Sequence, residues 1–404
     1  MRNKVIAALI ALAAIISLAL ALKYGGNDAG SASSEQPAPH RIPAETTYRD
    51  AALDAIKTGV EYLMNTQRET GAWGTFQPSV GITGLVVHAM LISPLGMNPA
   101  NTPAIRKGLD FIASSARENG EINDPDGYAN YNTSIAIMAL AASGDPKYET
   151  LIKKGQAFIM GQQYAENLGV TSDNPIYGGI GYGSDKSRPD MSNTQWAIEA
   201  LSETGLSKDD PAFRKALFFL HRCQNLSEVN DLEYAAVVND GGGLYTSQPD
   251  AKDISKAGQV TVRGKVGWRS YGSMTYAMLK SYLYLGLDKN SPEVKGALDW
   301  ISNNWTVAEN PGMANPMQGY YYYLATFAKT FDVLGQQVVV DAEGKEHNWA
   351  DEIIARVLSL RQPDGSWANS ADRWMEGDPA IVTAYVVRSL SFAYKAASDR
   401  MIGE

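Results

Sequence analysis

Tyrosines, arginines and carboxylic acids recur in the loops that lead into apolar segments of this 404-residue chain. Aromatic rings stabilise cations, arginines bind anions, and a buried carboxylic acid can give or take a proton. We select Asp190, Tyr271, Glu376 and Asp378 as candidate catalytic residues. The candidate ligand-binding residues lie in the same loops and at the helix starts after them: Tyr131, Asn132, Tyr182, Arg188, Asn193, Trp196, Arg269, Tyr320, Tyr322, Arg373 and Trp374.

These residue types also have structural explanations. Asp190 and Asp378 each precede a predicted helix, where aspartate commonly caps the first turn. Tyrosines near a helix start are often core residues with a solvated hydroxyl, and the three arginines could simply pair with the acids. Convergence favours a functional site, because arginines, tyrosines and acids all fall on loops that should face one opening.

Two kinds of helix alternate along residues 48–398, and one unit repeats. Asn132–Leu140 and Asn193–Leu201 share Asn, Thr, two Ala, Ile and Leu in register. The amphipathic helices are predicted at Ala51–Asn65, Pro103–Ser115, Glu149–Gln162, Pro211–Gln224, Pro292–Asn303 and Ala350–Leu360. The helices that are apolar nearly all round are predicted at Ile82–Ile92, Asn132–Ala142, Asn193–Thr204, Ser273–Leu285, Gln318–Leu334 and Pro379–Tyr394.

A helix that is apolar on every side must be buried on every side. The alternation therefore predicts an all-α fold, a single (α/α)6 toroid with the apolar helices inside and the amphipathic helices outside. An open solenoid is the alternative, but its last helix should be polar, and Pro379–Tyr394 is not. Residues 225–267 and Gln337–Lys345 should add small β-hairpins, the first of them over the mouth of the ring.

The inner helices of such a ring are parallel, so their N-termini meet at one mouth. Each N-terminus brings unpaired amides and a partial positive charge. The loops before these N-termini carry the selected residues, and loops on a rigid scaffold often carry function. We therefore expect a ligand-binding cleft at this mouth.

The junctions between outer and inner helices carry a further signature. Gln67-Arg68-Glu69-Thr70-Gly71-Ala72-Trp73 is one case, and Gln362-Pro363-Asp364-Gly365-Ser366-Trp367 is a shortened one. Glycine permits the turn, glutamine can bond loop amides, and tryptophan covers the next outer helix. Together with the repeated helices, this arrangement resembles the squalene–hopene cyclase and protein prenyltransferase superfamily of α/α toroids. The resemblance covers roughly residues 50–395 and implies the fold; unrelated activities share the ring, so it does not assign a reaction.

The residues that carry chemistry in that superfamily are missing here. Squalene-cyclase-like enzymes use an Asp-x-Asp-Asp cluster, and the nearest acidic pairs, Asp124 with Asp126 and Asp209 with Asp210, are typical of turns and caps. Prenyltransferase subunits bind zinc, but His221 and Cys223 lie two residues apart on a helix and point about 200° from one another. We expect no metal and no cofactor.

Three functions remain open. The repeat signature favours binding of an isoprenoid or lipid at the mouth, with the reaction unknown. An exported ring with a Tyr/Arg-lined mouth also suits a polysaccharide lyase or hydrolase, in which Asp190 with Glu376 or Asp378 would form an acid–base pair. The third function is a ligand- or partner-binding toroid without catalysis.

Composition and the N-terminus indicate the compartment. Arg2 and Lys4 precede an apolar stretch, and residues 1–22 are typical of a signal peptide or a single membrane anchor. Residues 23–47 have the composition of a flexible linker. The protein is therefore expected in the periplasm or another extracytoplasmic space, with possible membrane association through residues 1–22. A net charge of −9 without a basic run argues against a nucleic-acid partner.

Overall fold

The computed structural model describes residues 47–403 except 126, 184–187 and 249–252, and these belong to one compact unit. The expected export segment, residues 1–22, and all but the last residue of the expected linker lie outside the described residues. Of the helices in the described part, none is both long and apolar enough to cross a bilayer.

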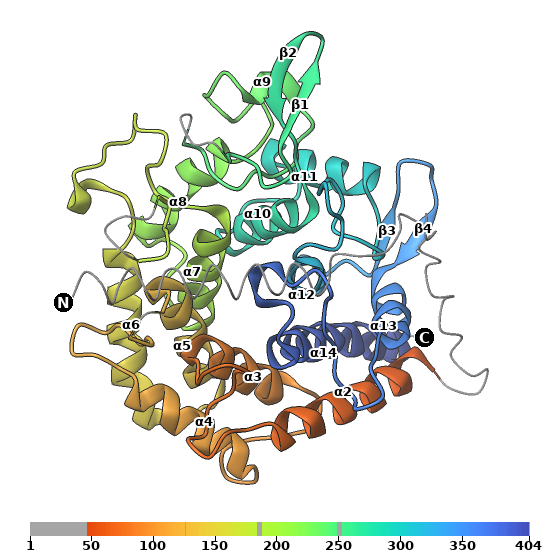
Figure 1. The fold of residues 1–404 in the computed structure, drawn as a ribbon. Helices are drawn as coiled ribbons and strands as arrows, with labels where there is room; N and C mark the ends of the chain where they lie inside the picture. The colour runs from red at the N-terminus through yellow and green to blue at the C-terminus, as the bar shows by residue number, and fades with distance from the viewer. Residues whose placement is uncertain (1–46, 126, 184–187, 249–252, 404) are drawn as a thin grey trace, which may run out of the picture. The chain divides into compact units, whose positions relative to one another are not determined.

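Six helices of the described chain form a closed inner barrel (Figure 1). Each contacts the next, and the last contacts the first, which excludes the open solenoid. The all-α toroid predicted from the sequence is therefore confirmed. In chain order, the inner helices are α3 (Val80–Ile92), α5 (Ala129–Ala142), α7 (Met191–Glu203), α10 (Gly272–Tyr284), α12 (Tyr320–Leu334) and α14 (Pro379–Gly403).

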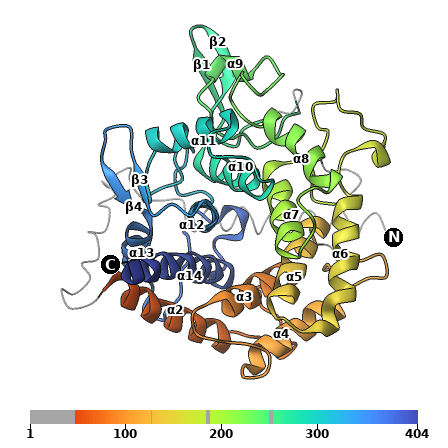
Figure 2. The same cartoon turned by 180° about the vertical axis from the view of Figure 1, so that it is seen from behind.

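Six amphipathic helices surround the barrel, and the reverse view shows the same ring (Figure 2). Most pack on an inner helix next to them in sequence, whereas the first outer helix packs on α14 and so joins the two ends of the described fold. They are α2 (Tyr48–Asn65), α4 (Pro103–Ser114), α6 (Glu149–Gly161), α8 (Pro211–Arg222), α11 (Pro292–Asn303) and α13 (Trp349–Ser359). Short helical turns lie at Pro146–Tyr148, Glu166–Leu168, α9 (Ala235–Val238) and Arg373–Met375.

The glutamine of the junction motif bonds the loop, as predicted, and also the next outer helix. Gln67 Nε2 donates to the carbonyl oxygens of Gly71, at 2.8 Å, and Ala104, at 2.9 Å. It therefore ties the turn to the first turn of the next outer helix, α4. Gly71 has φ +87°, which an L-residue would adopt only with strain. The same pair of bonds recurs from Gln163 to Gly178 and Ala212 and from Gln224 to Gly241 and Glu293, in junctions without the sequence motif.

A threonine near the start of five inner helices completes the repeat. Thr133 Oγ1 accepts the backbone N–H of Ile122 at 3.0 Å, and Thr194 Oγ1 accepts that of Ile180 at 3.0 Å. These are the threonines of the sequence repeat, and they fix the incoming loop against the helix. Equivalent bonds join Thr83 to Trp73, Thr275 to Gly243 and Thr383 to Trp367.

Replacing Thr133 with valine should lower the free energy of unfolding by about 1–3 kcal/mol, because the buried N–H of Ile122 loses its acceptor while the shape is kept. Urea unfolding followed by circular dichroism measures the change. Thr150→Val, on the exposed face of α6, is the matched control and should change stability little. Equal effects in the two variants would show that the bond contributes nothing specific.

The sequence pattern predicted inner helices that are apolar nearly all round, but the barrel also contains buried charged side chains. Glu199 of α7 is fully buried, with Oε1 2.8 Å from Arg388 Nη2 and Oε2 bonded to Lys280 Nζ. Burial alone would raise the pKa of Glu199, but the two cations hold it below its ordinary value. One turn further along α7, Glu203 pairs with Lys329 at 2.9 Å and with His88 at 3.5 Å. We call Glu199, Lys280 and Arg388 the buried triad.

Thr102, Asp210 and Ser291 occupy the N-cap positions of α4, α8 and α11. Asp210 accepts the N–H of Ala212 as expected, but Thr102 and Ser291 make no side-chain cap bond. The prolines that follow all three residues lie at the helix starts, and their fixed φ suits that position.

Two antiparallel hairpins decorate the ring. Strands β1 (Gln259–Val262) and β2 (Lys265–Trp268) form the first, and β3 (Val338–Val340) and β4 (Glu346–Asn348) form the second. The β1–β2 hairpin was expected over the mouth, but both views show it projecting outward beyond α11 (Figures 1 and 2).

Candidate functional site

Two adjacent pockets, which we call lobes, lie where the inner helices begin, and they share four lining residues. The smaller one, about 200 Å³, is lined by Tyr128, Tyr131, Tyr182, Ser192, Tyr245, Lys256, Tyr271, Ser273, Met274, Gly319, Tyr322, Trp374, Met375, Ile381 and Tyr385. We call it the aromatic lobe. The larger one, about 860 Å³, is lined by residues 74–79, Gly81, Ile82, Leu85, Phe111, Ser115, Arg117, Asn123–Pro125, Gly127, Tyr128, Tyr131, Asn132, Ile135, Met375, Asp378 and Ile381. We call it the mixed lobe.

Four tyrosines of the aromatic lobe bond to one another in pairs through their hydroxyls. Tyr131 OH lies 3.0 Å from Tyr385 OH, and Tyr182 OH lies 3.3 Å from Tyr245 OH. Burial raises the pKa of Tyr131 and raises that of Tyr182 to about 12, so both phenols are neutral at ordinary pH. Since the hydroxyls are paired, the rings present mainly apolar faces to a ligand.

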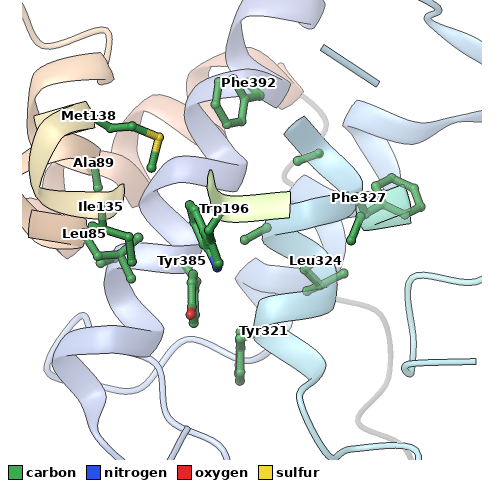
Figure 3. Close-up of a cluster of buried hydrophobic side chains, with 14 of the residues drawn as sticks. Leu85, Ala89, Ile135, Met138, Trp196, Tyr321, Leu324, Phe327, Tyr385 and Phe392 are labelled. Atoms are coloured by element: carbon green, nitrogen blue, oxygen red, sulfur yellow. The ribbon is translucent and has the colours of Figure 1, made fainter. Parts of the chain in front are cut away.

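A tryptophan supports this wall from the barrel interior. Trp196 packs edge-to-face on Tyr131 at 5.8 Å, and Figure 3 shows it among side chains such as Ile135 and Tyr385. Lys280 Nζ and Arg388 Cζ lie 5.4 and 5.1 Å from the centre of its ring. Trp196 was predicted to bind ligand, but it lies behind the lining residues and joins the aromatic lobe to the buried triad.

Asp190 is buried behind the aromatic lobe. Its Oδ1 accepts the backbone N–H of Asn193 at 2.8 Å and its Oδ2 accepts Asn193 Nδ2 at 2.9 Å, which makes it the cap of α7. Burial raises the pKa of Asp190 to about 6, against the lowering effect of these bonds and of the nearby Tyr245 hydroxyl. Tyr245 lines the lobe, so Asp190 reaches the cavity through one phenol.

Glu376 and Asp378 are also helix caps. Glu376 Oε1 accepts the N–H of Tyr322, at the start of α12, at 2.8 Å, and Oε2 accepts Asn369 Nδ2 at 2.7 Å. Burial raises the pKa of Glu376 to about 7. Asp378 caps α14 and also accepts the N–H of Thr75 at 2.8 Å. Of these two acids, Asp378 lines the mixed lobe and Glu376 lines neither lobe.

The three arginines selected from the sequence do not converge on the cavity. Arg188 pairs with Asp253, and Arg269 is exposed. Arg373 bonds Gln318 at 3.1 Å and lies 4.3 Å from the ring of Trp374. Among the described lining residues, the cations are Lys256 in the aromatic lobe and Arg117 in the mixed lobe.

Of the remaining residues selected from the sequence, some line the lobes and others do not. Tyr131, Tyr182, Tyr271, Tyr322 and Trp374 line the aromatic lobe, and Asn132 lines the mixed lobe. Asn193 is buried against Asp190. Tyr320 points away from the cavity, because its hydroxyl donates to Val307 O at 2.6 Å and accepts Arg356 Nε at 2.9 Å, towards the outer shell.

Several lining residues were missed by the sequence analysis. Tyr385 lies two turns into α14, inside a pattern that indicated only an apolar core. Tyr245 and Lys256 come from the insertion between α8 and α10, which has no periodic pattern to place its side chains. The Lys256 ammonium lies 4.3 Å from the Tyr245 ring, so this insertion supplies a cation–π pair to the wall.

Two consecutive residues at the mouth are backbone-strained. Trp374 and Met375 have φ of +61° and +66°, which costs of order 1–3 kcal/mol per non-glycine residue. Both line the aromatic lobe and are 42% and 49% exposed. Met375 also lines the mixed lobe, so this strained segment borders the junction of the two lobes.

No cluster of three or more His, Cys, Asp or Glu side chains suited to a metal ion occurs in the part of the chain that the structure describes. His221 pairs with Glu293 at 3.0 Å, while Cys223 is buried at the end of α8.

Comparison with solved structures places this geometry in a known fold. Ligand-free type II terpene cyclase MstE from Scytonema matches with a TM-score of 0.54 at 14% identity, over 86% of this chain and 99% of that chain. Its complex with merosterolic acid A, described as the product, gives the same values. The complex of a variant with geranylgeranyl dihydroxybenzoate, described as the substrate, matches with a TM-score of 0.52 at 14% identity, over 87% and 98% of the two chains. The fold is a terpenoid-cyclase-like toroid.

No protein-family model and no curated protein matches the sequence. At 14% identity the structural likeness extends to the fold of the toroid, and its function must be argued from its own cavity.

Proposed function

We propose that this protein is an exported toroid that binds an isoprenoid or a similarly apolar lipid in the aromatic lobe. The observation that carries the proposal is a cavity lined by seven tyrosines, Trp374 and two methionines at the mouth of the inner barrel. Ring faces whose hydroxyls are already paired suit an apolar chain better than a charged ligand.

The comparison supports the same ligand class. MstE, which shares the ring, has been solved with a geranylgeranyl substrate. The glutamine-to-carbonyl bonds at the helix junctions support a relation to the squalene–hopene cyclase repeat group. Gln67, the glutamine of the sequence motif that resembles this group, makes one such pair of bonds.

Asp190 is the acid that we assign to any proton transfer in this pocket. It is buried, its pKa is raised to about 6 by that burial, and Tyr245 connects it to the lobe. Like Asp190, Glu376 and Asp378 use both oxygens to hold backbone or amide N–H groups, but neither of them lines the aromatic lobe. A hydrolytic pair with Asp190, the basis of the glycan alternative, therefore has less support than lipid binding.

Filling the aromatic lobe tests the proposal. Ser192 lines the lobe at the start of α7, and Ser192→Trp should weaken binding of farnesol by at least about tenfold, because the indole would occupy the space of the ligand. Isothermal titration calorimetry measures the affinity. Ser114→Trp on the exposed face of α4 is the matched control and should bind farnesol like the parent protein. Equal affinity in both variants would exclude the aromatic lobe as the site.

A purified sample can also separate the alternatives. Native mass spectrometry of protein taken from its own cells should show a retained lipid if the proposal is right. A retained oligosaccharide, together with no affinity for farnesol, would favour the glycan-active alternative.

Export rests on residues 1–22 alone. Residues 1–47 fused to alkaline phosphatase should give periplasmic activity in a Gram-negative host, and deletion of residues 5–22 should abolish it. Activity that is independent of that deletion would contradict export through this segment.

A further inference from the structure

The mixed lobe lies beside the aromatic lobe but has different chemistry. The two share the lining residues Tyr128, Tyr131, Met375 and Ile381, so one ligand bound in both would pass these four side chains. The lining of the mixed lobe combines apolar groups, including Leu85, Phe111 and Ile135, with a polar wall of carboxylates, amides and hydroxyls. A ligand that spans both lobes therefore meets an aromatic pocket at one end and a polar wall at the other.

The carboxylates of that wall occupy the amides that would otherwise bind an anion. Asp124 accepts the N–H of Val80, at the start of α3, with both oxygens at 3.1 and 3.0 Å, and its Oδ2 also accepts Asn132 Nδ2 at 3.2 Å. Asp378 accepts the N–H groups of Thr75 and Ala380. Helix N-termini attract anions through such amides, and here the protein's own side chains already use them.

The lining cation is also occupied. Arg117 Nη1 lies 2.8 Å from Glu121 Oε1, and its Nη2 donates to the Asp124 carbonyl at 3.4 Å. A phosphate or carboxylate ligand would face two acids and a guanidinium that already has a counter-ion. The balance of the described lining charges, one arginine against two aspartates, is unfavourable for an anion.

A cationic ligand would gain little electrostatic attraction from the two aspartates. Each aspartate caps a helix start, whose partial positive charge of roughly half a unit offsets part of the negative charge. What the wall retains is hydrogen-bond acceptors, since a carboxylate has about four lone-pair sites. The matching ligand groups are donors without net charge.

We infer that the mixed lobe binds an uncharged, hydroxyl-bearing head group of the ligand whose apolar chain occupies the aromatic lobe. Hydroxyls donating to Asp124 and Asp378 make charge-assisted bonds, which are roughly twice as strong as neutral ones. This inference rests on the proposed function for the apolar half of the ligand, and it adds the class of the polar half.

Probes with one chain and different head groups test the inference. Decanol, decyl β-D-glucopyranoside, decyl phosphate and decylamine are titrated below their micelle-forming concentrations, and affinities are measured by calorimetry. The glucoside should bind at least about tenfold more tightly than decanol, and the phosphate should bind more weakly than decanol. Glucoside and decanol affinities that are equal, or tightest binding by the phosphate or the amine, would overturn the inference.

Two variants assign the effect to this lobe. Gln77 is an exposed lining residue, so Gln77→Arg adds a cation there without disturbing the core. It should raise the affinity for decyl phosphate by about tenfold relative to the affinity for decanol. Asp124→Asn keeps a cap acceptor and should reduce the preference for glucoside over phosphate, whereas Asp210→Asn, the same change at the cap of α8, should not. Unchanged preferences in both Gln77→Arg and Asp124→Asn would overturn the assignment.

The outcomes separate this inference from the proposed function. Farnesol binding that is lost in Ser192→Trp, with no preference among head groups, would leave the aromatic lobe as a lipid site and remove the head-group assignment. Absence of farnesol and decanol binding would instead remove the lipid site itself.

Discussion

Replacing Glu199 with glutamine should lower the free energy of unfolding by about 3–5 kcal/mol, one of the largest effects expected for a single side chain in this protein. Glu199 is fully buried between Lys280 and Arg388, which are only 2% and 3% exposed. The substitution leaves two cations in the barrel without a counter-ion, and neither can reach water. Urea unfolding of the variant and the parent protein measures the difference.

Apolar side chains should be able to replace all three members of the triad together, although loss of one member alone destabilises the protein. Glu199→Leu, Lys280→Met and Arg388→Met together remove the charges along with their desolvation cost, so most of the lost stability should return. Glu61→Gln on the exposed face of α2 is the control and should change stability by less than about 0.5 kcal/mol. A single Glu199→Gln variant as stable as this control would contradict a strongly coupled buried charge.

Stability should fall as pH rises through neutrality because of Glu376. Burial raises the pKa of Glu376 from 4.5 to about 7, so the folded state favours the protonated acid. Its contribution is therefore fully present below about pH 4.5 and is lost as pH rises through about 7. A rise in the pKa of Glu376 from 4.5 to about 7 corresponds to about 3 kcal/mol.

The difference between the parent protein and Glu376→Gln isolates this residue from other titrating groups. Unfolding free energies measured from pH 4 to pH 8 should show a smaller decrease in the variant, with the difference developing between about pH 4.5 and 7. Glu61→Gln is again the control and should leave the profile of the parent unchanged. Parallel profiles for the parent and Glu376→Gln would show that the carboxyl titrates normally in the folded protein.

The helices and their alternation could be predicted from the sequence because the buried face of a helix requires apolar residues at a regular spacing. The inner helices begin within three residues of the predicted positions, from Val80 in α3 to Pro379 in α14. The charges inside the barrel could not be predicted in the same way. Glu199, Lys280 and Arg388 come from three different helices, and only the closed ring brings the three side chains together.

Which side chains face the cavity depends on helix phase. Tyr320 and Tyr322 lie two residues apart at the start of α12, so they point about 200° from one another, and only Tyr322 lines the aromatic lobe. The sequence shows a run of tyrosines and not which of them faces inward. The acids illustrate a second limit, since Asp190 is recognisable as a helix cap, whereas the approach of Tyr245 depends on a long insertion.

The contact between α14 and α3 has a consequence for biogenesis. Helix α14 also packs against α2, α12 and α13 and lines both lobes through Ile381, so the pocket has no complete wall until the last segment of the chain has emerged. Pairing of the two ends is the most non-local step available to the ring, and such steps are slow. The nascent ring therefore stays open until α14 has been synthesised, and neither lobe has its full lining before then.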